Sequence, residues 1–301
     1  MIRLAATIFV GLIGLAFGSF LNVCLSRWPE GESVVKPRSH CRACGRTLSW
    51  WENVPLLSWL ALRGRCRTCK EKISWRYPLV ELAVGGLWAI DTWHYFFAVQ
   101  HLSWTAWGLL FLIVCLIGPF LLTWLLVALA ALDADHLWLP DKLTLSGILS
   151  GVIVAALRRY FFDGSIPTPV TFANFFASPL MRDFWLGRFL AILAAAALVL
   201  LIRWTYKLIR HREGIGIGDA KLMAMLAAWL GLPGALLSFA IGVILGAIVA
   251  LVMLAVPKSQ RGPQAWAITK LPLGTFLCIG GIVSALWGQP ILAAYMRYAG
   301  F

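Results

Sequence analysis

The chain has 301 residues, of which 60% are hydrophobic and only 13% charged, and it carries 16 Trp and 17 Phe. This balance excludes an ordinary soluble domain as the main fold. A formal net charge of +13 does not predict nucleic acid binding, because the basic residues border apolar stretches, where they face anionic lipid headgroups. We therefore expect an integral membrane protein that contacts lipid and binds no nucleic acid.

Several apolar stretches approach the ~20 residues that are needed to cross a bilayer. They cover residues 4–25, 77–98, 108–132, 143–157, 186–204, 220–230, 235–256 and 271–295. The fourth and the sixth are short, which favours either a re-entrant segment or a thinned membrane. Leu232, Pro233 and Gly234 predict a tight outer turn between the sixth and the seventh stretch. The sequence thus predicts an all-α, polytopic bundle of about eight transmembrane helices.

The basic residues also predict the orientation of the chain. Of the 26 Lys and Arg, 20 fall in connections on the side of residues 26–76, and short cytoplasmic connections retain positive charge. Both termini are then expected outside. The chain divides into a first transmembrane helix over 1–25, a cytoplasmic insert over 26–76 and a transmembrane bundle over 77–301. The connection over 158–185 is expected to lie on the outer membrane surface.

The insert contains two cysteine pairs with metal-ligand spacing. Cys41 and Cys44 form one pair and Cys66 and Cys69 the other, with 21 residues between them. Two such pairs supply four thiolates, a complete tetrahedral shell for zinc. Neighbouring arginines favour the thiolate form, while reduced or redox-active thiols are the alternative. The remaining cysteines lie in or beside apolar stretches, where packing is expected: Cys24, Cys115 and Cys278.

Acidic residues gather at the cytoplasmic ends of two apolar stretches. Asp133, Asp135 and Asp141 follow one, and Asp219 precedes another. Carboxylates at the edge of the bilayer are functional candidates when they face the bundle interior. We expect Asp135 and Asp141 in a solvated loop. Asp133 and Asp219 are the candidate pair, because two carboxylates that share a proton can hydrolyse a peptide bond.

Other residues near this pair are candidates for supporting roles. Gly216 and Gly218 permit positive φ and would let an extended substrate approach Asp219. Lys221 either orients Asp219 or extends to the lipid headgroups. Glu81, near the cytoplasmic end of its apolar stretch, is expected to contact the functional region.

These residues occur in a set of local sequences that resembles a known family, the bacterial prepilin leader peptidases, aspartyl proteases with a Gly-x-Gly-Asp motif that also N-methylate their product. The resemblance rests on the cysteine pairs and on five segments: Phe17 to Val23, Glu52 to Leu60, Tyr77 to Glu81, Asp133 to Asp141 and Gly216 to Leu222.

The resemblance implies both an activity and a location. The expected reaction removes the basic leader from type IV prepilins or type II secretion pseudopilins at the cytoplasmic face of the bacterial inner membrane. Methyl transfer from S-adenosylmethionine to the new amino terminus follows. Asp133 and Asp219 are the implied catalytic residues, and residues 77–301 the implied peptidase bundle. The sequence holds no glycine-rich fingerprint for the methyl donor, so its binding residues are unassigned and the cysteine insert is the candidate region.

The sequence departs from the family at Thr275, where a second proline is common, and in the long connection over 158–185. We expect neither to touch the aspartates. Three alternatives stay open: a proton-coupled transporter that uses the two aspartates as a relay, a peptidase without methyltransferase activity, and a non-enzymatic adaptor with a zinc module.

Overall fold

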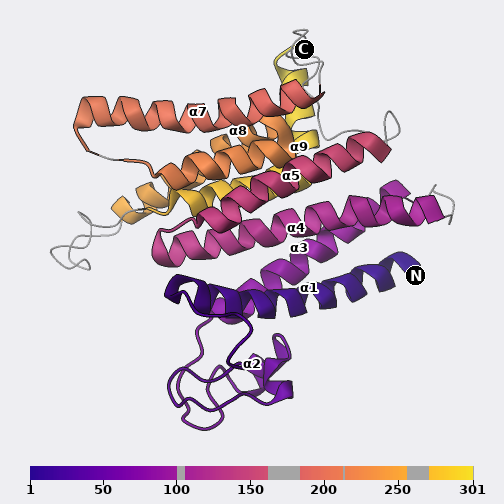
Figure 1. Ribbon diagram of the computed structural model, residues 1–301, viewed down its shortest axis with the longest axis vertical. Helices are drawn as coiled ribbons and strands as arrows, with labels where there is room; N and C mark the ends of the chain where they lie inside the picture. The colour runs from indigo at the N-terminus through magenta and orange to yellow at the C-terminus, as the bar shows by residue number, and fades with distance from the viewer. Residues whose placement is uncertain (100–105, 162–183, 213, 256–270, 301) are drawn as a thin grey trace. The chain divides into compact units, whose positions relative to one another are not determined.

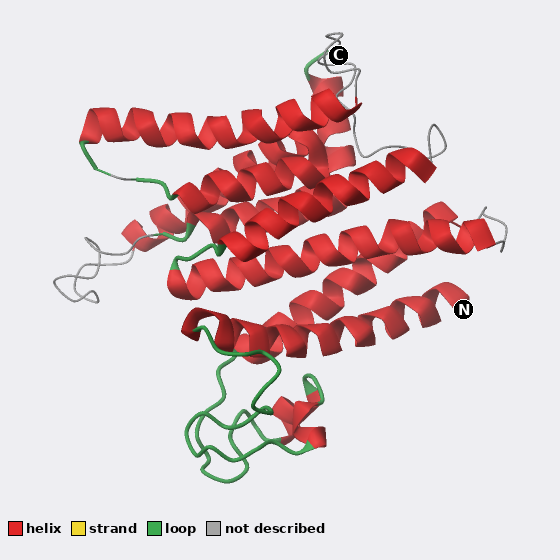
Figure 2. Cartoon of the chain, viewed as in Figure 1, coloured by secondary structure: helices red, strands yellow, loops and turns green. Residues whose placement is uncertain are grey.

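The computed structural model describes residues 1–99, 106–161, 184–212, 214–255 and 271–300. Within these ranges the protein is built of helices, and the only strand-like pairing is a pair of isolated β-bridges (Figures 1 and 2). The prediction of an all-α membrane protein is confirmed. The chain folds as two compact units, Met1–Ala131 and Leu132–Phe301.

The N-terminal unit contains α1 (Ile2–Arg27), α3 (Arg76–Val99) and most of α4 (Ala106–His136). Between α1 and α3 lies the insert, whose few helical turns are η1 (Trp28–Glu30), η2 (Trp50–Asn53) and α2 (Leu57–Ala61). The remainder of the insert is loop (Figure 2).

Small residues bring α1 and α3 into close contact. A Cβ atom added to Gly14 would lie 2.9 Å from the Cα of Gly85, and one added to Gly18 would lie 2.6 Å from the Cα of Glu81. Glycine is therefore required for this backbone approach, as at many interfaces between membrane helices. The contact fixes the position of Glu81 relative to α1.

The C-terminal unit contains the end of α4, then α5 (Asp141–Phe161), α7 (Phe184–Arg210), α8 (Ile217–Ala255) and α9 (Leu273–Tyr298). The fourth predicted stretch proves long enough for a full span, because α5 has 21 residues. Most of the predicted outer connection over 158–185 lies outside the described residues.

By length and composition, fewer helices qualify as membrane spans than predicted. Within the described ranges, six helices are long and apolar enough to cross a membrane: α1, α4, α5, α7, α8 and α9. One reason is that α8 includes both the sixth and the seventh predicted stretch. The other is that α3, with Glu81 and Asp91 in its sequence, is not among the six although it is helical throughout its predicted stretch.

The backbone of α8 breaks at Gly231, where φ is 73° and ψ is 175°. The break comes one residue before the predicted turn. The second arm runs antiparallel to α9, since Gly234 lies near Ser284 and Gly242 near Leu277. The two arms thus form a helical hairpin, and Figure 1 shows α8 starting and ending on the same side. Asp219, in the first arm, is thereby brought to the level at which α9 begins.

Candidate active site

Both candidate aspartates are buried at helix ends. Asp133 lies in the last turn of α4 and is 6% exposed, whereas Asp219 lies in the first turn of α8 and is 7% exposed. Because α4 continues to His136, Asp133 does not end the helix as expected but belongs to it. A carboxylate that is held this deep requires polar partners.

The partners of Asp133 come from the start of α9. The backbone N–H of Thr275 donates to Asp133 Oδ2 at 2.7 Å, and the Thr275 hydroxyl lies 3.2 Å from the same oxygen. A Cβ atom on Gly274 would approach Asp133 Oδ2 to 2.9 Å, so only glycine leaves room for the carboxylate there. The expectation that Thr275 does not touch the aspartates is therefore wrong, because sequence distance concealed a contact across 142 residues.

Asp219 is held by its own Gly-x-Gly-Asp turn. The backbone N–H of Gly216 donates to Asp219 Oδ2 at 3.1 Å. Neither Gly216 nor Gly218 has a positive φ, so that expected reason for glycine does not apply. Instead, a Cβ atom on Gly218 would lie 3.0 Å from the Cβ of Leu139, which means that glycine is needed for close packing.

The two aspartates lie close enough for their carboxyl groups to interact. Both also lie near Cys278 of α9, which is fully buried. Leu139 packs against the positions of both Gly218 and Gly274, so it joins the turn that carries Asp219 to the start of α9, which contacts Asp133. Sequence reasoning missed Leu139, whose apolar side chain carries no chemical signal.

Lys221 does not orient Asp219. Its Nζ lies 2.5 Å from Asp141 Oδ1, in an ion pair that joins the starts of α8 and α5. Asp141 and Asp135 are solvent exposed as expected, but neither lies in a loop, because Asp135 belongs to the last turn of α4 and Asp141 begins α5. Lys221 thus fixes the helix that carries Asp219 and acts on the site only indirectly.

The four predicted metal ligands also converge, in the N-terminal unit. The sulfur atoms of Cys41, Cys44, Cys66 and Cys69 all lie within 4.8 Å of one another. Each pair is closed by a β-bridge, His40 with Thr47 and Arg65 with Lys72. Four sulfurs at this separation fit the shell of one tetrahedral ion.

The pKa values of the cysteine thiols indicate that a cation is needed for all four to ionise. Hydrogen bonds from the main chain of Cys69 and Thr68 lower the pKa of the Cys66 thiol to about 6. At Cys69 a main-chain hydrogen bond from Glu71 lowers the pKa, but burial and the neighbouring sulfurs outweigh it and raise the pKa to about 11. Crowded sulfurs cannot all ionise without a positive ion between them. The three other cysteines were predicted to pack, and Cys24 and Cys278 are indeed buried, while the side chain of Cys115 lies outside those described.

An ion pair supports the insert beside the cluster. Arg46 donates to both carboxylate oxygens of Glu52, at 2.6 and 3.1 Å, and the backbone N–H of Ser49 donates to Glu52 at 2.8 Å. Hydrogen bonds from Arg46 therefore lower the pKa of Glu52 to about 2. Bidentate pairs of this kind fix geometry as well as charge.

A bundle of apolar helices that buries two interacting carboxylates at helix ends has the construction of a membrane-embedded aspartyl protease. Comparison with known proteins agrees. Residues 12–95 match the model of the bacterial peptidase A24 N-terminal domain, and residues 120–251 match that of the type IV leader peptidase family.

Relatives match along nearly the whole chain. Prepilin leader peptidase/N-methyltransferases of Stutzerimonas stutzeri and Pseudomonas aeruginosa are each 35% identical over 96% of this chain and 93% of their own. That of Myxococcus xanthus is 36% identical over 89% of this chain and 68% of its own. No solved structure matches. The chain belongs to the type IV leader peptidase family.

Proposed function

We propose that the protein removes the basic leader peptide from type IV prepilins or type II secretion pseudopilins and then N-methylates the new amino terminus. The convergence of Asp133 and Asp219, both buried and interacting, is the observation that carries the proposal. Both lie within residues 120–251, the range of the peptidase family match. The relatives named above carry both activities in their names.

Hydrolysis follows from a pair of carboxylates that share one proton. The ionised carboxylate takes a proton from water while the protonated one donates a hydrogen bond to the scissile carbonyl oxygen. The hydroxide oxygen bonds to the carbonyl carbon, the C–N bond then breaks, and a proton passes to the leaving amine. Thr275 and Gly216 hold the two carboxylates in place for this step.

Two further components belong to the proposal. We infer that the four cysteines hold zinc, which would supply much of the folding free energy of an insert with few apolar residues. S-adenosylmethionine supplies the methyl group. The predicted location is the bacterial inner membrane, with the aspartates and the insert at the cytoplasmic face, and it is supported by the distribution of basic residues.

Cleavage of a prepilin with a basic leader tests the peptidase. We would compare wild type, Asp133→Asn and Asp219→Asn, with Asp135→Asn as the matched control, because Asp135 is a nearby but exposed carboxylate. Each buried substitution should abolish cleavage while the protein still inserts, and the control should cleave normally. Mass spectrometry of the product would add the mass of one methyl group if methylation occurs. Normal cleavage by either buried variant would disprove the pair.

Metal analysis tests the cluster. Purified protein should hold one zinc ion per chain, and Cys66→Ser should lose it, whereas Cys24→Ala, which changes a buried cysteine outside the cluster, should retain it. Trypsin should then cleave the insert of Cys66→Ser faster than that of wild type, since the insert loses its metal-dependent fold. Full zinc content in Cys66→Ser would contradict the assignment.

A further inference from the structure

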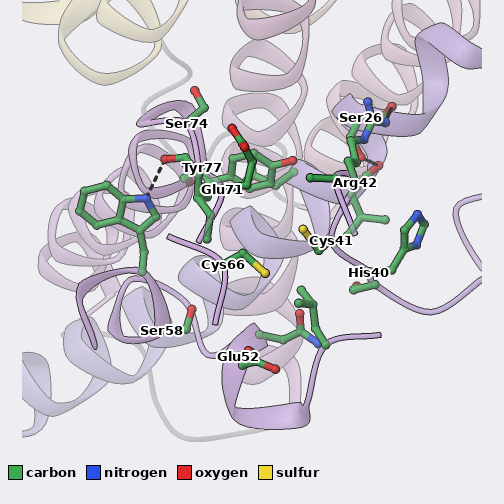
Figure 3. A pocket seen from close by; sticks show the side chains of 18 of the residues that line it. Ser26, His40, Cys41, Arg42, Glu52, Ser58, Cys66, Glu71, Ser74 and Tyr77 are labelled. Carbon is green, nitrogen blue, oxygen red and sulfur yellow. Dashed lines mark hydrogen bonds between the residues drawn. The ribbon is translucent and has the colours of Figure 1, made fainter. Parts of the chain in front are cut away.

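The N-terminal unit contains a cavity of about 670 Å³ that the hydrolytic mechanism does not use. Side chains from α1, from the insert and from α3 border it, as Figure 3 shows for Ser26, Cys41, Cys66 and Tyr77. The volume is typical of sites for small organic ligands. All residues that line the cavity fall within residues 12–95, the range that matches the A24 N-terminal domain model.

The end of the cavity between α1 and α3 holds an acidic side chain without a counter-ion. Glu81 is 7% exposed, and one carboxylate oxygen accepts the backbone N–H of Leu56 at 2.8 Å. Ser19 and Asn22 lie within hydrogen-bonding reach of the same carboxylate. In the part of the chain that the structure describes, no Lys, Arg or His pairs with Glu81. A buried carboxyl in this situation is neutralised either by a proton or by a cation.

The backbone that holds Glu81 is strained. Leu56, whose N–H it accepts, has a φ of 58°, which is rare for a residue with a branched side chain. Such strain persists where the surroundings impose it and is concentrated at binding sites. The Leu56 contact thus attaches the insert to α3 at the carboxylate itself.

Asn22 supplies an unsatisfied hydrogen-bond acceptor at the same end. It is 2% exposed, and its Nδ2 donates to the backbone carbonyl of Tyr77 at 2.9 Å. Its Oδ1 is buried without a hydrogen-bond partner. A buried acceptor of this kind is costly unless a ligand donates to it.

Three of the basic side chains that line the cavity are already engaged. Arg42 pairs with Glu30 at 3.0 Å, and Arg46 pairs with Glu52 at 2.6 Å. Arg27 donates to the carbonyls of Ser33 and Pro37. None of the three pairs with Glu81, which leaves this carboxyl available to a cationic ligand.

The wall also offers an aromatic surface. Trp59 lines the cavity. Its Nε1 donates a hydrogen bond to the carbonyl of Ile73 at 3.3 Å, and its ring packs against that of Trp75, with the ring centroids 4.2 Å apart. A fixed indole favours a flat heteroaromatic ring. The cavity therefore combines features for a ligand that has a positive charge, N–H donors and an aromatic ring.

We infer that this cavity binds S-adenosylmethionine, an inference that rests on the proposed methyltransferase function. Glu81 would neutralise the positive charge of the sulfonium donor, Asn22 Oδ1 would accept a hydrogen bond from one of its N–H groups, and Trp59 would contact the adenine. In the transfer, the lone pair of the deprotonated amine forms the N–C bond. The S–C bond breaks with its electron pair left on sulfur, giving neutral S-adenosylhomocysteine, and the amine loses a proton to water.

Ligand charge provides the decisive test. Full-length protein in nanodiscs, without prepilin, is titrated with S-adenosylmethionine and with S-adenosylhomocysteine by equilibrium dialysis. Glu81→Gln should weaken binding of the cationic sulfonium about tenfold or more and that of the neutral thioether much less, because only the charge attraction is removed. Equal losses for both ligands would indicate a merely structural role and overturn the inference. Asp91→Asn, which removes another buried carboxyl of α3, is the matched control and should change neither affinity.

A second measurement locates the ligand directly. Ultraviolet crosslinking of radiolabelled S-adenosylmethionine, with and without prepilin, should label a peptide that contains Trp59 or Tyr77. Label confined to residues 132–301 would disprove the site. Prepilin cleavage by Glu81→Gln should persist, so a failed site leaves the peptidase intact. A wild type that never methylates would instead disprove the methyltransferase half of the proposed function.

Discussion

Thr275 holds Asp133 through two groups, a backbone N–H and a hydroxyl, and both point at the same carboxylate oxygen. From the resemblance described above, many members of the family are expected to have proline at this position. Proline has no N–H, so a chain with proline here would lack this backbone hydrogen bond. The departure thus coincides with a direct contact to the candidate active site.

Substitutions at Thr275 should separate these two hydrogen bonds. Thr275→Val removes the hydroxyl, and we expect cleavage to slow by about tenfold, since a hydrogen bond to a charged group contributes about 1.5–3 kcal/mol. Thr275→Pro removes the N–H as well and should be slower still, although proline is tolerated in the first turn of α9. Single-turnover cleavage of a prepilin measures both. Wild-type rates in both variants would show that Thr275 does not position Asp133.

The pair of Glu52 with Arg46 predicts an acid-sensitive insert. Because the pKa of Glu52 is lowered to about 2 from 4.5, its contribution to folding is complete above pH 4.5 and is lost as the pH falls toward 2. The difference in unfolding free energy between wild type and Glu52→Gln should therefore be constant from pH 7 to about 4.5 and shrink below. Denaturant titration at a fixed excess of zinc, with the zinc content of both proteins followed at each pH, measures it. A difference that persists to pH 2 would contradict the assignment.

Among the elements, α1 and α3 depend most clearly on small residues. Gly14→Ala would place a Cβ atom 2.9 Å from the Cα of Gly85, and the two backbones would have to separate. We expect a loss of about 1–3 kcal/mol. Gly86→Ala on α3 is the control, because nothing lies within 4 Å of the added methyl group and alanine favours helix. In one detergent, the midpoint of thermal unfolding should be lower for Gly14→Ala than for wild type, and equal or higher for Gly86→Ala. The reverse order would refute the packing argument.

The break in α8 shows how an element can determine the site. A continuous 39-residue helix would extend far beyond a bilayer of ~30 Å. Gly231 adopts a positive φ that other residues rarely reach, and Pro233 follows within the helix. The resulting hairpin returns the chain to α9, whose first turn contacts Asp133.

At the scale of the whole molecule, the proposed chemistry is divided between two units. The aspartates and Thr275 belong to Leu132–Phe301, whereas the four cysteines and the cavity belong to Met1–Ala131. Each set of residues is complete within its own unit. The two activities are therefore expected to be lost separately by substitution.

The distribution of basic residues predicts the topology of the complete chain. Alkaline phosphatase fused within the insert should be inactive, because the enzyme folds only outside the cytoplasm, and the same fusion after Tyr298 should be active. Green fluorescent protein at the two positions should give the opposite result. Activity of the phosphatase within the insert would invert the orientation and place the cysteines outside.

The sequence by itself determined the class of protein, the aspartate pair and the four-cysteine cluster. Apolar stretches of membrane length, a Gly-x-Gly-Asp turn and two Cys-x-x-Cys pairs are local signals, and they predict chemistry without knowledge of packing. The number of spans was predicted less well, since the sixth and seventh stretches join at Gly231 within α8 and α3 carries Glu81 and Asp91.

Only the tertiary structure decided which residues surround these sites. Thr275 meets Asp133 across 142 residues, Lys221 pairs with Asp141 across 80, and Glu81 accepts a hydrogen bond from Leu56 of the insert. Such partners depend on which helix faces are brought together. Helix packing is set by side-chain shape along the whole interface, and no single short motif encodes it.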